Sequence, residues 1–168
     1  MTLLHQPQSA DVPWPSDAPD ARLGGLLLLD SSVQPAVPAP PEEDREQGVD
    51  STVQRDWNVY LVRLPSTPAG REYGLIGELF ICEKDWHLKV SALTPLQLRG
   101  ALQEEAHGLG PEALTERYGP WATHVLWDFV AQHARMLAAG VLRTFDLPSE
   151  SPPAEYGVPD YLRPTDPD

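Results

Sequence analysis

Glu78 is the residue whose type and position best suit acid–base chemistry. It interrupts the apolar run Gly74–Cys82, which predicts a β-strand with alternate side chains on opposite faces. Glu78 shares one face with Ile76, whereas Leu75 and Leu79 share the other. If the Glu78 face is buried, the desolvated carboxyl group is a candidate general acid or base. If the other face is buried, which the alternation favours by a small margin, Glu78 is an ordinary surface residue.

Cys82 and His87 form a second candidate pair for catalysis. Cys82 is the only cysteine, and His87 follows it across a short connection between two predicted strands. A histidine within hydrogen-bond reach can activate a cysteine as a nucleophile. However, no orienting acid is suggested nearby, and a lone cysteine in a strand is usually a small core residue. We therefore assign no catalytic residue, and a single cysteine also excludes an intramolecular disulfide.

Three further side chains, His124, Asp128 and His133, have the chemistry of metal ligands. All three fall in the segment 120–145, whose apolar spacing predicts a long helix. His124 and Asp128 share a face, but His133 lies nine positions beyond His124, on the opposite side at about 100° per residue. Because the three side chains cannot converge, the sequence predicts no metal site. It contains no phosphate-binding loop either, and no cofactor is predicted.

A polar stripe on the same predicted helix favours contact with another protein. The stripe contains His124, Asp128 and Arg135, and Trp127 lies nearer to it than to the apolar stripe. Tryptophan is frequent among residues that dominate binding energy, so these four are candidate partner-binding residues. The alternative is a solvated polar face with Trp127 in the core, which requires no partner.

The segment 22–30, with the sequence RLGGLLLLD, is a second candidate binding element. It is the only strongly apolar patch within the first 55 residues, which are otherwise polar and rich in proline. Such an apolar island is typical of a docking segment, and Leu26, Leu27 and Leu28 are its candidate contacts. It can add as an edge strand to this protein's own sheet or to the sheet of a partner.

Proline and charge divide the chain into three parts. Residues 1–55 contain eight of the 19 prolines, residues 56–146 contain five and residues 147–168 contain six. The net charges of the three parts are −6, −3 and −4, and four of the five tryptophans lie in the middle part. We therefore predict a globular domain over 56–146 between two acidic, proline-rich tails that are mostly disordered.

The pattern of apolar segments predicts the fold class α+β. Short connections indicate a three-stranded antiparallel meander, which becomes four-stranded if residues 22–30 dock. Thr94, Pro95 and Gln97 have the types expected at a capped helix start. Three helices follow, and the last is long and carries a wide apolar band, so we expect it to pack on the sheet. The expected strands span 57–64, 74–82 and 86–90, and the expected helices span 94–108, 111–119 and 120–145.

These features favour a non-enzymatic protein–protein interaction module, adaptor or chaperone-like, with flexible acidic tails. The expected partner is another protein, for which a basic surface would be complementary, and a homodimer is compatible with exposed sheet edges. The negative charge disfavours direct binding to nucleic acid or to a membrane, and the lack of a signal sequence indicates a cytoplasmic location. Two alternatives remain: an acidic mimic or inhibitor of a basic nucleic-acid-binding partner, and a small enzyme with a pocket near Glu78 and Cys82.

Overall fold

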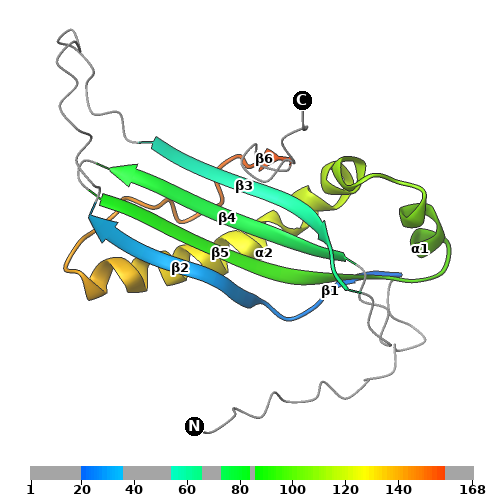
Figure 1. Cartoon of the computed structure of the whole chain (residues 1–168), viewed down its shortest axis with the longest axis horizontal. Coiled ribbons are helices and arrows are strands. Elements are labelled where there is room, and N and C mark those ends of the chain that lie inside the picture. Colours follow the sequence, from blue (N-terminus) through cyan, green and yellow to red (C-terminus); the bar gives the residue numbers. More distant parts are fainter. Residues whose placement is uncertain (1–19, 36–53, 66–72, 84–85, 158–168) are drawn as a thin grey trace, which may run out of the picture.

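The computed structural model describes residues 20–35, 54–65, 73–83 and 86–157. Within these ranges the chain forms one mixed sheet and two helices, the longer of which lies against one face of the sheet (Figure 1). The α+β class is therefore confirmed. The strands are β1 (Ala21–Leu23), β2 (Leu27–Pro35), β3 (Gln54–Arg63), β4 (Tyr73–Glu83), β5 (Trp86–Leu98) and β6 (Glu155–Tyr156), and the helices are α1 (Gly100–His107) and α2 (Pro111–Gly140).

The sheet is built around a meander in which β4 pairs antiparallel with both β3 and β5. Both β1 and β2 pair antiparallel with the other side of β5, so residues 21–35 form one interrupted edge strand. At the opposite edge, β6 pairs in parallel with β3. The predicted count of three or four strands is wrong, because segments on both sides of the predicted domain add to its sheet. The segment 22–30, a possible docking strand for this sheet or a partner's, lies within β1, β2 and their connection.

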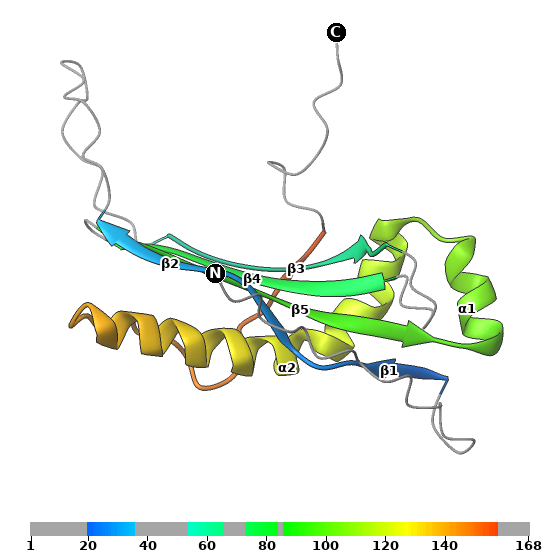
Figure 2. The same cartoon turned by 60° about the horizontal axis from the view of Figure 1, so that its bottom comes forward.

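Alternation along the central strands places the core between the sheet and α2 (Figure 2). In β3, the side chains of Trp57, Val59 and Leu61 are buried in one cluster with apolar residues of α2. Burial of alternate apolar side chains against a helix is the main favourable contribution to such a layered fold. We call the sheet surface that faces α2 the core face. The opposite surface is the open face, because neither described helix covers it.

The predicted helix start at Thr94 is wrong, because β5 continues to Leu98. Thr94 is fully buried, and the alternation of the strand overrides the local capping pattern. Pro95 is tolerated inside the strand. In a β-strand the N–H and the carbonyl of one residue point to the same side, so the N–H that Pro95 lacks would point where the Pro95 carbonyl points. That carbonyl accepts a hydrogen bond from the Gly24 N–H at 2.7 Å, in the gap between β1 and β2. Helix α1 begins only at Gly100.

The helices predicted over 111–119 and 120–145 are the single helix α2, so the predicted count of three helices is wrong. Pro120 lies inside α2 and removes one N–H donor. The carbonyl that loses this donor belongs to Glu116, and both residues are exposed, so water can replace the bond. Gly119 also lets the helix continue, because it has no Cβ atom to clash with the proline ring.

Residues 145–157 return along α2 to the sheet, and we call them the C-terminal strap. Arg135 of α2 donates hydrogen bonds to the Leu147 and Pro148 carbonyls at 3.4 and 3.1 Å. Part of the segment predicted as the second tail is thus held against the domain. The predicted disorder of the two tails falls largely on residues outside the described ones, namely 1–19, 36–53 and 158–168.

Tyr156 anchors the strap against a glycine of α2. A Cβ atom at Gly119 would lie 2.7 Å from Cδ1 of the Tyr156 ring, and the Tyr156 hydroxyl lies 3.0 Å from the Thr123 hydroxyl. We expect Gly119→Ala to displace the ring, and to cost about 1 kcal/mol more in the native protein than in a Tyr156→Ala background. Urea denaturation of the four proteins measures this coupling. An equal cost of Gly119→Ala in both backgrounds would contradict the contact.

Candidate functional site

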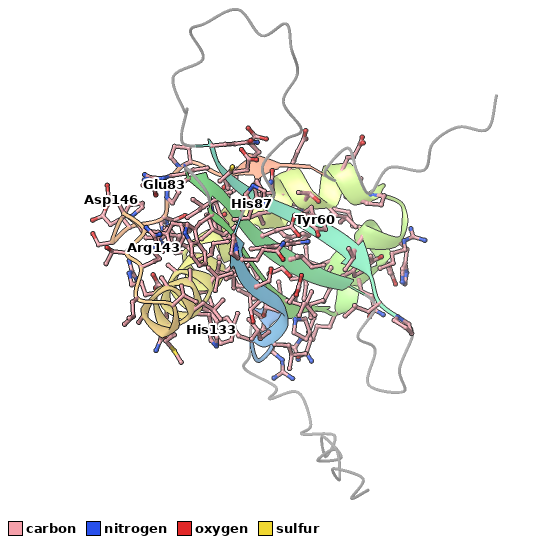
Figure 3. All side chains as sticks on the ribbon, turned by 60° about the vertical axis from the view of Figure 1, so that its left-hand side comes forward. Tyr60, Glu83, His87, His133, Arg143 and Asp146 are labelled. Carbon is pink, nitrogen blue, oxygen red and sulfur yellow. The ribbon has the colours of Figure 1, made fainter. Side chains whose placement is uncertain are left out.

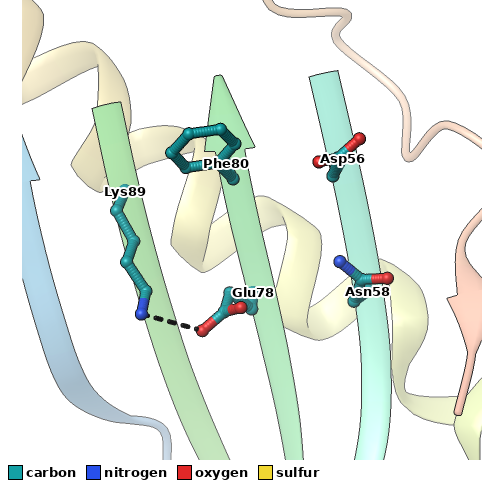
Figure 4. A pocket seen from close by; sticks show the side chains of 5 residues that line it. All are labelled: Asp56, Asn58, Glu78, Phe80 and Lys89. Carbon is teal, nitrogen blue, oxygen red and sulfur yellow. Dashed lines mark ion pairs between the residues drawn. The ribbon is translucent and has the colours of Figure 1, made fainter. Parts of the chain in front are cut away.

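A pocket of about 410 Å³ lies on the open face of the sheet, across β3, β4 and β5 (Figure 4). Every lining side chain comes from a strand and alternates with a side chain that faces the core. The sheet therefore fixes the positions of the pocket residues. They are Asp56 and Asn58 of β3, Glu78 and Phe80 of β4, and Lys89 of β5.

Cross-strand register brings these five residues together. Asn58 lies opposite Glu78, and Phe80 lies between Asp56 on one side and Lys89 on the other. Opposite side chains on neighbouring strands are about 5 Å apart at Cβ, so the five form one cluster. Sequence reasoning identified Glu78 but missed the other four. Their polar character at alternate strand positions was visible, but the register that joins them was not.

An ion pair between a buried carboxylate and a partly exposed lysine forms one side of the pocket. Lys89 Nζ lies 3.3 Å from Glu78 Oε2 and 3.9 Å from Asp30 Oδ2 of β2. Glu78 is only 6% exposed, so its carboxylate depends on Lys89 for compensation of its charge. Asp56 is half-buried and accepts a hydrogen bond from the Gln54 amide at 2.8 Å. Within the described residues, Asp56 forms no ion pair.

Tyr60 lies on the open face one strand position beyond the pocket (Figure 3). Its ring packs with Ile76 and Leu93 in a small apolar cluster. Burial, and to a lesser extent the negative charge of Glu78, raise the pKa of Tyr60 to about 12. The phenol is therefore neutral near pH 7 and adds no charge to this face of the sheet.

The two candidate catalytic residues share the open face but do not converge. The core face is the one that contains Leu75 and Leu79, yet Glu78 is buried on the opposite face and is no ordinary surface residue. Cys82 lies four residues along the strand, about 13 Å away at the usual rise. Cys82 is opposite His87 in register, and it does not line the pocket.

The three candidate metal ligands are also spread over α2. His124 and Asp128 are exposed. His133 is half-buried, with Nδ1 2.8 Å from the Phe129 carbonyl oxygen and its ring 4.3 Å from the Phe129 ring (Figure 3). No group of three potential metal ligands occurs in the part of the chain that the structure describes.

The candidate partner-binding residues of α2 have different environments. Trp127 is only 1% exposed and packs edge-on against Trp57, with ring centroids 5.2 Å apart. It therefore belongs to the core. Arg135 is exposed but holds the C-terminal strap through the hydrogen bonds described above. Of this group, His124 and Asp128 are exposed at the helix surface.

The candidate leucines lie at the edge of the sheet. Leu26 is half-buried and packs against the core. Leu27 and Leu28 are 55% and 42% exposed, and Leu29, which sequence reasoning did not single out, is 51% exposed. The structure therefore places three exposed leucines in succession on β2.

No protein-family model matches the chain, and no curated protein matches its sequence. Neither described helix is long and apolar enough to cross a membrane. Two features of the fold are candidates for function, namely the exposed leucines of β2 and the pocket on the open face.

Proposed function

We propose that this chain is a non-enzymatic protein-binding module that contacts its partner through the edge of its sheet. The observation that carries the proposal is the exposure of Leu27, Leu28 and Leu29, which we call the leucine edge. Exposed apolar side chains on an edge strand favour aggregation, and natural sheets usually place charge or proline there. Apolar residues kept at such an edge are typical of interaction surfaces.

The geometry of β2 suits an extended, apolar segment of a partner. β2 pairs with β5 along one side, and no described strand pairs with its other side. Leu28 lies opposite Ala92 of the core face, and Leu27 lies opposite Leu93 of the open face. The pairing is irregular between Leu28 and Asp30. A partner segment can therefore contact leucines on both faces of the edge while it pairs with exposed backbone groups.

Helix α2 extends this apolar surface. Leu28 of β2 and Gly77 of β4 both lie opposite Ala92 of β5 in register. Leu126 of α2 packs directly over Gly77. Val125 is exposed in the same turn. It points about 200° away from Trp127 around the helix, and the strap residues line a pocket with Trp127. Val125 therefore faces away from the strap, on the flank of α2 nearer to the leucine edge.

The partner is proposed to be another protein, or a second copy of this chain. No observation favours the alternative of an acidic mimic, and ten of the 14 acidic residues in the two predicted tails lie outside the described residues. The alternative of a small enzyme with a pocket near Glu78 or Cys82 stays a hypothesis. Glu78 lines the pocket on the open face, and Cys82 is not among the residues that line it.

Replacement of Leu27 and Leu29 by aspartate tests the proposal. Neither side chain belongs to the buried core, so the variant should fold, and circular dichroism checks this. We expect it to lose self-association in sedimentation velocity, or to bind a co-purified partner at least about tenfold more weakly when the two purified proteins are titrated.

Leu142→Asp is the matched control for this test. Leu142 is 94% exposed beyond the end of α2, at a φ of 55° that aspartate tolerates well. It makes the same kind of substitution away from the leucine edge, because the neighbouring Arg143 stacks on Trp86, which pairs with Pro35 at the other end of β2. Its binding should equal that of the native protein. Equal binding by the leucine-edge variant and the native protein would overturn the proposal.

A further inference from the structure

The pocket on the open face is separate from the leucine edge, and protein binding at β2 does not explain it. We propose that it binds an organic cation, a primary ammonium or guanidinium group on a short apolar chain. In this site the Asp56 carboxylate is the counter-charge and the Phe80 ring packs against the cation and its alkyl stem. The inference does not rest on the proposed function.

The charge of the pocket selects a cation. The ammonium group of Lys89 is already compensated by Glu78 at 3.3 Å and by Asp30 at 3.9 Å. Asp56 has only a neutral hydrogen-bond donor, the Gln54 amide, within the described residues. Among the described residues, the lining therefore keeps one half-buried carboxylate without a positive partner. A bound cation restores the interaction that this carboxylate loses on partial dehydration, whereas an anion would be repelled.

The shape and chemistry of the pocket fit such a group. Its volume of about 410 Å³ lies in the usual range for small-molecule sites, which is roughly 300–1,000 Å³. Phe80 is opposite Asp56 in register, and both line the pocket, so a cation bound there can contact the carboxylate and the aromatic ring together, as in known cation–π sites. Asn58, two residues from Asp56 on the same face, can accept a second N–H bond through its amide oxygen.

Two sources supply this chemistry, namely a free small amine and the lysine or arginine side chain of a protein. Their shared feature is a positive nitrogen group at the end of an alkyl chain. The experiment titrates the full chain with n-butylammonium, n-butylguanidinium and a blocked peptide that contains one arginine. Butanol and butyrate are the neutral and anionic controls of matched size. Isothermal calorimetry and the amide NMR signals of β3 and β4 report binding.

We expect saturable binding of the cations and none of butanol or butyrate. Asp56→Asn should weaken cation binding by about tenfold, since it removes a charge-assisted contact. Glu104→Gln removes the same charge from an exposed position on α1 and should leave the affinity unchanged. Phe80→Leu should weaken binding several-fold by removal of the ring.

The outcomes separate the two sources and can overturn the proposal. Binding of the small cations supports a free amine as the ligand, whereas binding of the arginine peptide alone supports a protein side chain in the same site. Failure of all three probes at millimolar concentration overturns the proposal, as does equal weakening by Asp56→Asn and Glu104→Gln. The Leu27→Asp, Leu29→Asp variant should bind the cations normally, so failure here is distinguishable from failure of the proposed function.

Discussion

Replacement of Trp127 by alanine should lower the free energy of unfolding by about 3–5 kcal/mol, the usual cost of truncating a large buried aromatic side chain. The Trp127 side chain is 1% exposed, and its ring meets the Trp57 ring edge-on at 5.2 Å. The substitution would leave a cavity between α2 and β3, and it would remove one wall of the pocket beneath the C-terminal strap. Guanidinium denaturation followed by circular dichroism measures the change.

Two further variants make this result interpretable. Trp127→Phe keeps an aromatic ring in the core, so it should remain folded and lose less stability than the alanine variant even if the latter fails to fold. Trp121→Ala, at a residue of the same helix that is 48% exposed, should cost about 1 kcal/mol or less. A normal stability for Trp127→Ala, with only partner binding lost, would contradict the placement of Trp127 in the core.

The sequence could not decide between core and surface for Trp127, and the physical reason lies outside its helix. Helical spacing separates the apolar stripe from the polar one, and Trp127 falls near their boundary. The strap settles its environment, because Leu147 and Pro148 lie over this flank of α2 and line a pocket with the Trp127 ring. When a later segment packs against one side of a helix, the spacing of apolar residues within the helix does not reveal it.

The predicted helix boundaries were wrong for a related reason. Local sequence patterns indicated helix starts and ends, but packing of the sheet against α2 overrode them. Thr94 and Pro95 match a capped helix start, but the sheet and α2 bury the alternate side chains that continue to Leu98. The Gly119–Pro120 pair predicts a break, but an exposed proline after a residue without Cβ costs too little to end a helix anchored by Leu126 and its buried neighbours.

The candidate pocket was predictable in part. Alternation favoured the Leu75 and Leu79 face of β4 as the core face, and it identified Glu78 as an acid in an apolar strand. The expectation that Glu78 would then be an ordinary surface residue is wrong, because its side chain is buried on the open face. Alternation could not show that Lys89 would compensate Glu78, or that Asp56 beside Phe80 would form no ion pair with another described residue. Those contacts depend on register, which the connections between strands determine and which alternation alone leaves open.

Gly77 of β4 is the position where the smallest substitution should have the next largest effect. A Cβ atom there would lie 2.6 Å from Cη2 of Trp57 and 2.9 Å from the Cβ of Leu126. Both neighbours are buried between the sheet and α2, so α2 must move away from the sheet or the indole ring must turn. We expect Gly77→Ala to lower the free energy of unfolding by about 1–3 kcal/mol, as overpacked cores do.

The sign of the stability change separates the steric contribution of a new Cβ atom, which destabilises, from its entropic contribution, which stabilises. Gly25, between β1 and β2, has no positive φ. Among the described residues, no atom outside its two chain neighbours lies within 4 Å of the position that a Cβ would occupy there. Gly25→Ala should therefore be neutral or stabilise the protein by about 0.4–1 kcal/mol, because alanine reduces the entropy of the unfolded chain. Gly77→Ala gains the same entropic term, so its net loss in urea denaturation measures the clash with the core.

Trp57→Phe identifies the atom responsible, because phenylalanine lacks the outer ring whose Cη2 approaches Gly77 most closely. In that background Gly77→Ala should cost clearly less than in the native protein, and a double-mutant cycle should give a coupling of about 0.5–3 kcal/mol. An equal cost in both backgrounds would assign the clash to Leu126 instead. In the proposed binding surface Val125 extends the leucine edge, and its position depends on how closely α2 approaches the sheet at Gly77. Displacement of α2 by Gly77→Ala should therefore weaken partner binding as well as stability, whereas Gly25→Ala should leave stability intact.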